Sequence, residues 1–282
     1  MEMSDESNVH TNTEAALMPD FDDPPVVETF LSVSFRDLEK WGIPHYGLYW
    51  NNIRSEYPKF ELRPPVLGQI ETFGESHDEA EAVFELNLNQ PPVRIWFIHG
   101  KANRLIQLQN DRLIFNWRKV TGDEKYPKFD ECIRGEFQKE WIRFREFLDS
   151  QSIPAPTVTQ CEISYINQIP GASWSTLKAL VSALNEWPGS KRNGFLPIPE
   201  DLQFNTRYVI AGHGRLHVQL QPAIRTVDGK NIIQLTLTAR GKPRSSDTEG
   251  LMQWFDIGRE WIVRGFTEFT SEEMHKSWRR RQ

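Results

Sequence analysis

The order of strand-like and helix-like segments constrains the fold of this chain most, because the same order occurs twice. Each time, a strand is followed by a helix, several further strands and a closing helix. The two opening strands are predicted at residues 26–35 and 160–167, where β-branched and aromatic residues partly alternate with polar ones. Both closing helices contain Glu-Trp-Ile, at 140–142 and 260–262. The offset of about 120 residues indicates an internal duplication.

Residue patterns and turn residues predict the remaining elements. Asp228-Gly229 and Asn110-Asp111 are typical of hairpin turns, so the strands on either side of them are expected to pair antiparallel. Pro64-Pro65 excludes a central strand at that point. The predicted helices are 37–57, 129–148, 173–187, 251–269 and a short one after Ser271; the further predicted strands are 69–73, 82–88, 93–99, 104–109 and 112–119 in the first unit and 203–211, 216–225 and 232–240 in the second.

These elements predict the α+β class. Each unit is expected to be a strand, a helix, an antiparallel meander and a helix, with the sheet curled against the helices. The order of elements resembles the duplicated saddle of the TATA-binding protein and, more loosely, a helix-grip arrangement. This likeness concerns architecture and implies no function.

Charge and proline content predict how the chain is divided. Residues 1–23 contain seven acids and neither Lys nor Arg, and taking them from the net charge of −6 leaves about +1 for the rest. Such a polar, acidic segment buries too little apolar surface to become ordered, whereas Pro154-Ala155-Pro156 favours an extended spacer. We predict a disordered acidic tail at 1–23, a first α+β unit at 24–150, a linker at 151–157 and a second unit at 158–282. The arginines at 279–281 are interpreted as a solvated helix end.

Cysteine content and hydropathy bear on the cellular setting. The two cysteines, Cys132 and Cys161, are interpreted as buried thiols in a reducing compartment. No stretch reaches the roughly 18 apolar residues of a membrane helix, and the N-terminus does not resemble a signal peptide. We therefore expect a cytoplasmic protein without a membrane partner.

The familiar motifs of catalysis and cofactor binding are missing from the sequence. It contains no Cys-x-x-Cys, His-Glu-x-x-His, Gly-x-Ser-x-Gly or phosphate-binding loop, and Gly212-His213-Gly214 lacks the third glycine of a dinucleotide fingerprint. His213 and His217 would share one face of a strand, so a two-histidine metal site stays open beside the simpler interpretation as surface histidines. We predict no cofactor, no metal site and no catalytic residue.

Two segments place amide and basic side chains between apolar positions. They are residues 107–119 in the first unit and 234–242 in the second, and each ends in arginine and lysine. Amides and guanidinium groups bind anions, base edges or peptide main chain, although a solvated sheet face would have the same pattern. We predict a polar strip where the two segments approach each other across a pseudo-two-fold axis. Its candidate ligand- or partner-binding residues are Gln107, Gln109, Asn116, Arg118, Lys119, Arg240 and Lys242.

Several strings of residues carry a resemblance to a protein family. They are Pro24-Pro25-Val26-Val27-Glu28, residues 105–109 and 115–119, Tyr126-Pro127, residues 160–167, and the spaced pattern Phe255-Asp256, Trp261-Ile262, Phe266, His275 and Trp278. Over residues 24–278 the chain resembles an uncharacterised, sporadically distributed prokaryotic family without an assigned function. The resemblance supplies no catalytic or binding residues. A patchy distribution implies an accessory role, for example in stress or defence.

Three functional hypotheses follow from the sequence. The first is a non-catalytic binding or protein-interaction module whose partner is a protein or a small ligand. The second is an enzyme or small-ligand binder with a pocket inside a curled sheet, assembled from residues such as Glu162, Asp256, Glu260 or His217. The third is nucleic-acid binding through the basic residues of the strip and the terminal arginines; a body of near-neutral charge does not favour it.

Overall fold

The chain folds into an antiparallel sheet with helices, as a computed structural model shows for residues 17–66, 70–71, 93–171, 173–181 and 202–281. In these residues the sheet has nine strands, in the order β2-β3-β4-β5-β1-β6-β9-β8-β7. The strands are β1 (Val26–Phe35), β2 (Lys59–Arg63), β3 (Arg94–Ile98), β4 (Arg104–Gln109), β5 (Arg112–Arg118), β6 (Val158–Pro170), β7 (Phe204–Ile210), β8 (Gly214–Ile224) and β9 (Asn231–Gly241). The mixed α+β class predicted from the sequence is confirmed.

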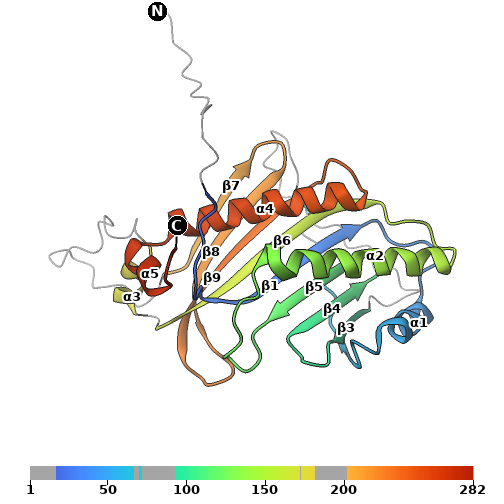
Figure 1. Cartoon of the computed structure of the whole chain (residues 1–282), viewed down its shortest axis with the longest axis horizontal. Coiled ribbons are helices and arrows are strands. Elements are labelled where there is room, and N and C mark those ends of the chain that lie inside the picture. Colours follow the sequence, from blue (N-terminus) through green and yellow to red (C-terminus); the bar gives the residue numbers. More distant parts are fainter. Residues whose placement is uncertain (1–16, 67–69, 72–92, 172, 182–201, 282) are drawn as a thin grey trace, which may run out of the picture.

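Helices cover one face of this sheet. They are α1 (Ile43–Ile53), α2 (Arg134–Ser150), α3 (Trp174–Leu180), α4 (Thr248–Phe269) and α5 (Glu272–Ser277); a π-helical turn, η1 (Phe129–Ile133), precedes α2. Figure 1 shows the long helices α2 and α4 lying across the same face of the sheet. α1 joins this layer, because Tyr49 packs against Phe97 of β3 and Phe147 of α2.

The centre of the sheet is the pair β1 and β6. The two strands run antiparallel, with Leu31 opposite Ile163. β1 pairs on its other side with β5, the last strand of its half, and β6 pairs in the same way with β9. α2 ends at Ser150 and β6 begins at Val158, so the predicted linker lies between them and leads back into the same sheet. The two halves therefore share one continuous sheet.

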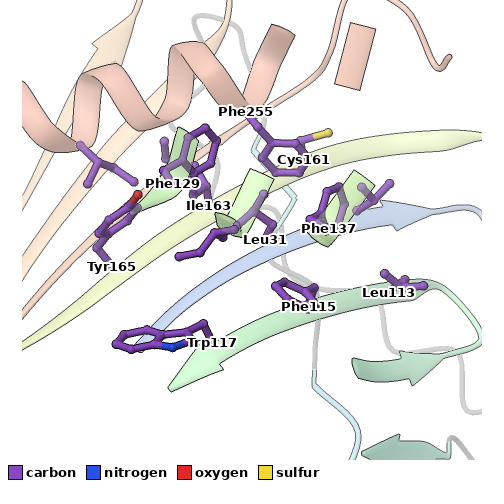
Figure 2. Close-up of a cluster of buried hydrophobic side chains, with 14 of the residues drawn as sticks. Leu31, Leu113, Phe115, Trp117, Phe129, Phe137, Cys161, Ile163, Tyr165 and Phe255 are labelled. Carbon is purple, nitrogen blue, oxygen red and sulfur yellow. The ribbon is translucent and has the colours of Figure 1, made fainter. Parts of the chain in front are cut away.

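Alternation along the central strands separates apolar from polar side chains. On one face Leu31, Phe115 and Ile163 are fully buried, and they meet Phe137 of α2 and Phe255 of α4 (Figure 2). We call the opposite face of the sheet, turned away from these helices, the polar face. Because successive strand residues point to opposite faces, the neighbours Asn116 and Ser164 lie there.

The two ends of the chain pack together, and this differs from the expectation for the N-terminal tail. Of the predicted disordered segment 1–23, residues 17–23 are ordered, while 1–16 lie outside the described residues. Phe21 is buried against Phe266 and Trp278, and Asp22 pairs with Arg281. The average composition of 23 residues does not show that a single aromatic residue, Phe21, can pack onto the C-terminal helices. It also does not show that acids of this segment can pair with the C-terminal arginines.

Some predicted elements are placed differently or lie outside the described residues. The helix expected at 37–57 is the shorter α1, and β2 was not predicted. β2 is an exposed edge strand that ends directly before Pro64, where proline is tolerated because no further strand needs its N–H. The predicted strands 69–73 and 82–88 and the second half of the helix 173–187 lie mostly outside the described residues.

Candidate functional site on the polar face

Side chains on the polar face form rows that run across the strands. In one row Gln109 of β4 lies opposite Arg112 of β5, Arg112 opposite Ser34 of β1, and Ser34 opposite Gln160 of β6. All four residues are buried. Burial of polar groups in such a row requires partners for their donors and acceptors, because an unpaired buried polar group is costly.

Four arginines lie on the first half of this face, and we call them the arginine cluster: Arg63, Arg94, Arg112 and Arg118. Three of them surround the indole of Trp96. The Cζ atom of Arg63 lies 4.3 Å from the ring centroid, and those of Arg94 and Arg118 lie 5.7 Å away. Arg63 is opposite Arg94 across β2 and β3. Cation–π contacts of this kind hold guanidinium groups in place without consuming their N–H donors.

Arg112 is the most unusual member of the cluster. It is only 6% exposed, and its Nε has no hydrogen-bond partner. Within the described ranges no carboxylate forms an ion pair with it. A charged side chain that is almost fully buried is normally paired, because removal from water is strongly unfavourable.

The electrostatics of Arg94 also indicate an excess of positive charge. Burial lowers the pKa of the Arg94 guanidinium, and the nearby charges of Arg63 and Arg112 lower it further. Its Nη1 donates to Gln107 Oε1 at 2.9 Å, but its Nε is buried without a partner. Within the described part of the chain, Arg63 is the member of the cluster that forms a salt bridge, with the exposed Glu61 of its own strand.

A chain of amides connects the cluster to the centre of the sheet. Gln107 Oε1 accepts from Trp96 Nε1 at 2.9 Å, and Gln107 Nε2 donates to Asn116 Oδ1 at 2.8 Å. Asn116 Nδ2 donates to Glu28 Oε1 at 2.6 Å. Burial raises the pKa of Glu28, against the opposing effects of this hydrogen bond and of the charge on Arg118. The side-chain amides of Gln107 and Asn116 therefore help to hold Trp96 and Arg94 in position on the sheet.

In the second half of the face, by contrast, the half-buried cations Arg215, His217 and Arg240 are paired with acids. Arg240 Nε donates to Glu162 at 2.8 Å. Arg215 and His217 of β8 hold the carboxylate of Glu71, with Arg215 Nη1 at 2.7 Å. Burial alone would raise the pKa of Glu71, but the hydrogen bonds from His217 and Arg215 outweigh it and lower the pKa to about 2. Among the described residues, the buried or half-buried cations of this face that lack a carboxylate partner therefore lie in the first half.

The connection after β2 is anchored on this face by side-chain amides. Gln109 accepts from the main-chain N–H of Val66 at 2.6 Å and donates to the carbonyl of Val66 at 3.2 Å. Gln160 accepts from the N–H of Glu71 at 2.8 Å. The amides of this row are therefore suited to holding extended main chain.

The structure places the seven predicted binding residues in three groups. Gln107, Gln109, Asn116 and Arg118 lie together on the first half of the polar face, whereas Arg240 lies on β9. Lys119 and Lys242 lie just beyond the ends of their strands, and Lys242 is exposed. β1 and β6 separate β5 from β9, so the two segments are about 14 Å apart at the ordinary strand spacing and do not meet directly.

Sequence reasoning did not select Arg63, Arg94, Trp96 or Arg112. Arg94 and Trp96 alternate with Ile95 and Phe97, and this alternation is the signal that places the first two residues on the polar face. The order of the strands, which brings β2 and β3 beside β4, is needed to show that the four residues belong to one cluster.

The acids and histidine considered for an enzyme are not brought together. Glu162 and His217 lie on the polar face, bonded to Arg240 and Glu71. Asp256 and Glu260 lie on α4, on the other side of the sheet, where each pairs with an arginine. Cys132 and Cys161 are free thiols, and burial raises the pKa of both.

Comparisons with known proteins add no relative to this description. No protein-family model matches the chain, and the search of curated proteins found no match. Among the described helices, none is both long and apolar enough to cross a membrane. The function is therefore argued from the chemistry of the polar face.

Proposed function

We propose that this is a non-catalytic binding protein, and that its ligand presents an anionic group, a carboxylate or a phosphate, to the arginine cluster. The observation that carries the proposal is Arg112, a residue that is 6% exposed, whose Nε has no hydrogen-bond partner and which forms no ion pair with a carboxylate of the described residues. Arg94, whose Nε is also buried without a partner, supplies a second donor in the same cluster.

The energetics favour an anion as the missing partner. A buried donor without an acceptor costs about 1–3 kcal/mol, and more when the group is charged. Hydrogen bonds between guanidinium and carboxylate or phosphate are about twice as strong as neutral ones, and guanidinium can bind both groups in a bidentate way. Binding an anion would therefore recover free energy that the unliganded fold lacks.

The arrangement of groups supports binding over catalysis as the first proposal. The cluster contains donors that are held in place by Trp96 and Gln107. The residues named for an acid–base mechanism lie in pairs on opposite sides of the sheet, and each is engaged in an ion pair. An enzyme with a pocket inside the fold remains the second hypothesis, and nucleic-acid binding is treated as one outcome of the experiment below.

We also propose that the two halves arose by duplication. The equivalent connections support this: each half begins with a central strand that pairs with the last strand of its own meander, and a long helix follows. The saddle-like or helix-grip likeness and membership of the sporadically distributed prokaryotic family, with an accessory role in stress or defence, stay proposals. On this view the two halves diverged in charge: Arg215, His217 and Arg240 of the second half are paired with acids, whereas Arg94 and Arg112 of the first half form no ion pair within the described residues.

The proposal is tested by calorimetric titration of the full chain in 50 mM salt with three probes. Pyrophosphate tests the anion site itself, a single-stranded oligonucleotide tests a phosphate polymer, and a tetraglutamate peptide tests carboxylates. We expect saturable binding of at least one probe, weakened more than tenfold in Arg94→Gln and in Arg112→Met. The matched control is Arg279→Gln, which removes an exposed arginine paired with Asp23 far from the cluster.

The pattern of affinities identifies the ligand class. Preference for the oligonucleotide, with an affinity that falls steeply with salt, would favour the nucleic-acid hypothesis. Preference for the peptide would favour a protein partner. If none of the probes binds, or if Arg279→Gln weakens binding as much as the cluster variants, the cluster is not the binding site.

A further inference from the structure

A small cavity lies on the opposite side of the sheet, between α4, β6 and the N-terminal segment. Its volume is about 60 Å³, and its walls include Phe21, Tyr126, Tyr165, Arg259 and Val263. Tyr165 lies on the helix-covered side of β6, near Phe129 (Figure 2). No residue of the arginine cluster lines this cavity, so it is a separate place for a ligand.

The wall contains two donors for which the described residues supply no acceptor. The hydroxyl groups of Tyr126 and Tyr165 are 2.7 Å apart and bond to each other. One of the two hydroxyl hydrogens makes this bond, which leaves the other hydrogen to donate elsewhere. The Nε of Arg259 is buried without a partner, and its Nη2 pairs with Asp130 at the exposed end of the side chain. The free tyrosine hydroxyl hydrogen and the Nε–H of Arg259 could therefore both donate to an acceptor group of a ligand in this cavity.

Most of the remaining wall is apolar; the other polar residues that line it are Asp20, Lys128 and Asn167, whose Nδ2 donates to the carbonyl of Leu235. Val26, Leu237, Ile262, Val263 and Phe266 provide aliphatic and aromatic surface. Burial in this setting raises the pKa of Tyr165 to about 12, against the opposing effects of Tyr126 and Arg259, so both hydroxyl groups keep their hydrogens near neutral pH. Lys128, at the same cavity, is already paired with Asp20. A fitting molecule thus combines an acceptor head with a short apolar body.

We propose that this cavity binds a short-chain carboxylate. The carboxylate would accept hydrogen bonds from the tyrosine pair and from Arg259, and the alkyl group would lie against Leu237 and Val263. A volume of about 60 Å³ exceeds the roughly 10–15 Å³ that one water occupies and matches a molecule of a few non-hydrogen atoms. A ligand this small reaches affinities of roughly micromolar to millimolar.

The N-terminal segment closes one side of the cavity. Pro19, Phe21 and Pro24 contribute to the wall, and Phe21 is held by edge-to-face contacts with Phe266 and Trp278. The main-chain N–H of Asp22 and that of Asp23 donate to carbonyls of Arg279 and Trp278. The cavity therefore depends on the pairing of the two chain ends, and a ligand in it would stabilise that pairing.

Saturation-transfer NMR with propionate on the full chain tests the proposal, with ethylammonium as a probe of similar size and opposite charge. We expect saturable propionate binding that Tyr165→Phe weakens at least fivefold and that Val263→Phe, which fills the cavity, abolishes. Tyr208→Phe alters an exposed tyrosine on β7 and serves as the control. The affinity of this variant for propionate should equal that of the unaltered protein.

Thermal unfolding of each variant shows whether it is folded, and Tyr165→Phe alone decides the case if Val263→Phe unfolds. The proposal is overturned if propionate does not saturate the protein, if Tyr165→Phe binds it with unchanged affinity, or if ethylammonium binds equally well. These outcomes leave the arginine cluster untouched, because the cavity and the cluster share no residue.

Discussion

At the scale of single residues, the polar face is distinguished by which charges have partners. Glu71 is the clearest paired case: it lies between Arg215 and His217, and its carboxylate is largely buried. Among the described residues, Arg112 is the clearest case of a buried charge without an ion-pair partner. The difference matters because breaking a buried ion pair leaves an uncompensated charge and lowers stability, while a charge that is already unpaired lowers stability until a ligand binds it.

Glu71→Gln should lower the free energy of unfolding at pH 7 by about 1–2 kcal/mol, a figure reduced for solvent screening of a partly exposed group. The pKa of Glu71 falls from 4.5 to about 2 on folding. Its stabilisation is therefore complete above pH 4.5 and is lost as the pH falls towards 2. Urea unfolding at pH 7 and pH 3 should show a smaller difference between variant and unaltered protein at pH 3.

The control for this prediction is Glu61→Gln, which removes the acid of an exposed pair with Arg63. Exposed pairs contribute little, so the change should stay below about 0.5 kcal/mol at both pH values. A difference for Glu71→Gln that is the same at pH 7 and pH 3 would contradict the assignment of the ionised carboxylate as the stabilising group.

Residue types alone indicated part of this chemistry. The run of Gln, Asn and Arg in 107–119 correctly drew attention to the residues of β4 and β5 that share the polar face. The sequence alone does not show which of the cations on the polar face have an acid as partner and which do not. Glu71 and Arg215 are 144 positions apart in the chain, and only the folded sheet brings their side chains within 2.7 Å.

At the scale of elements, α4 packs closely on the sheet through two glycines. A Cβ on Gly258 would lie 2.8 Å from Cγ2 of Ile163, and one on Gly265 would lie 2.8 Å from Cδ2 of Leu216. These residues are seven positions apart and so lie on the same side of the helix. The small size of the two glycines allows α4 to lie close to β6 and β8. This close packing holds the helix layer against the face of the sheet opposite to the polar face.

Gly258→Ala should lower the free energy of unfolding by about 1–2 kcal/mol. Overpacking costs about 1–3 kcal/mol, and the better helix propensity of alanine returns up to about 1 kcal/mol. The control is Gly47→Ala in α1, where a Cβ meets nothing within 4 Å; this change should raise stability by about 0.5–1 kcal/mol. Urea unfolding of both variants makes the comparison, and equal effects would contradict close packing of α4.

Many elements were predictable because their signal is local. The alternation and turn residues correctly predicted β4, β5, β8 and β9 to within a few residues. α4 begins at Thr248, three residues before the predicted start, because Asp247 caps it by accepting from the N–H of Gly250. β2 was missed because a five-residue strand between prolines carries little pattern of its own. Its pairing with β3 is what makes it a strand.

At the scale of the whole molecule, one sheet joins the two halves, and the chain ends meet. The predicted repeat described the order of elements but not that β1 and β6 would form the centre of a common sheet. Composition described residues 1–23 as a tail, although Phe21 and the acids beside it pack onto the C-terminus. Both facts depend on contacts between distant residues, which local patterns do not contain.

This organisation places the arginine cluster at one side of a rigid platform. α2 and α4 fill the space behind the sheet (Figure 1), and the amide chain from Gln107 to Glu28 positions the cluster from within it. This platform keeps Arg112 buried in the unliganded protein. Unpaired charge is therefore a property of the whole fold, and its cost is measurable as global stability.

The most direct test of the binding proposal is the stability of Arg112→Met with and without pyrophosphate. In anion-free buffer the variant should be more stable than the unaltered protein by about 1–3 kcal/mol, because it removes a buried, unpartnered donor. Pyrophosphate should stabilise the unaltered protein and leave the variant unchanged. A variant that is less stable in anion-free buffer, or one that pyrophosphate stabilises equally, would contradict a guanidinium reserved for a ligand.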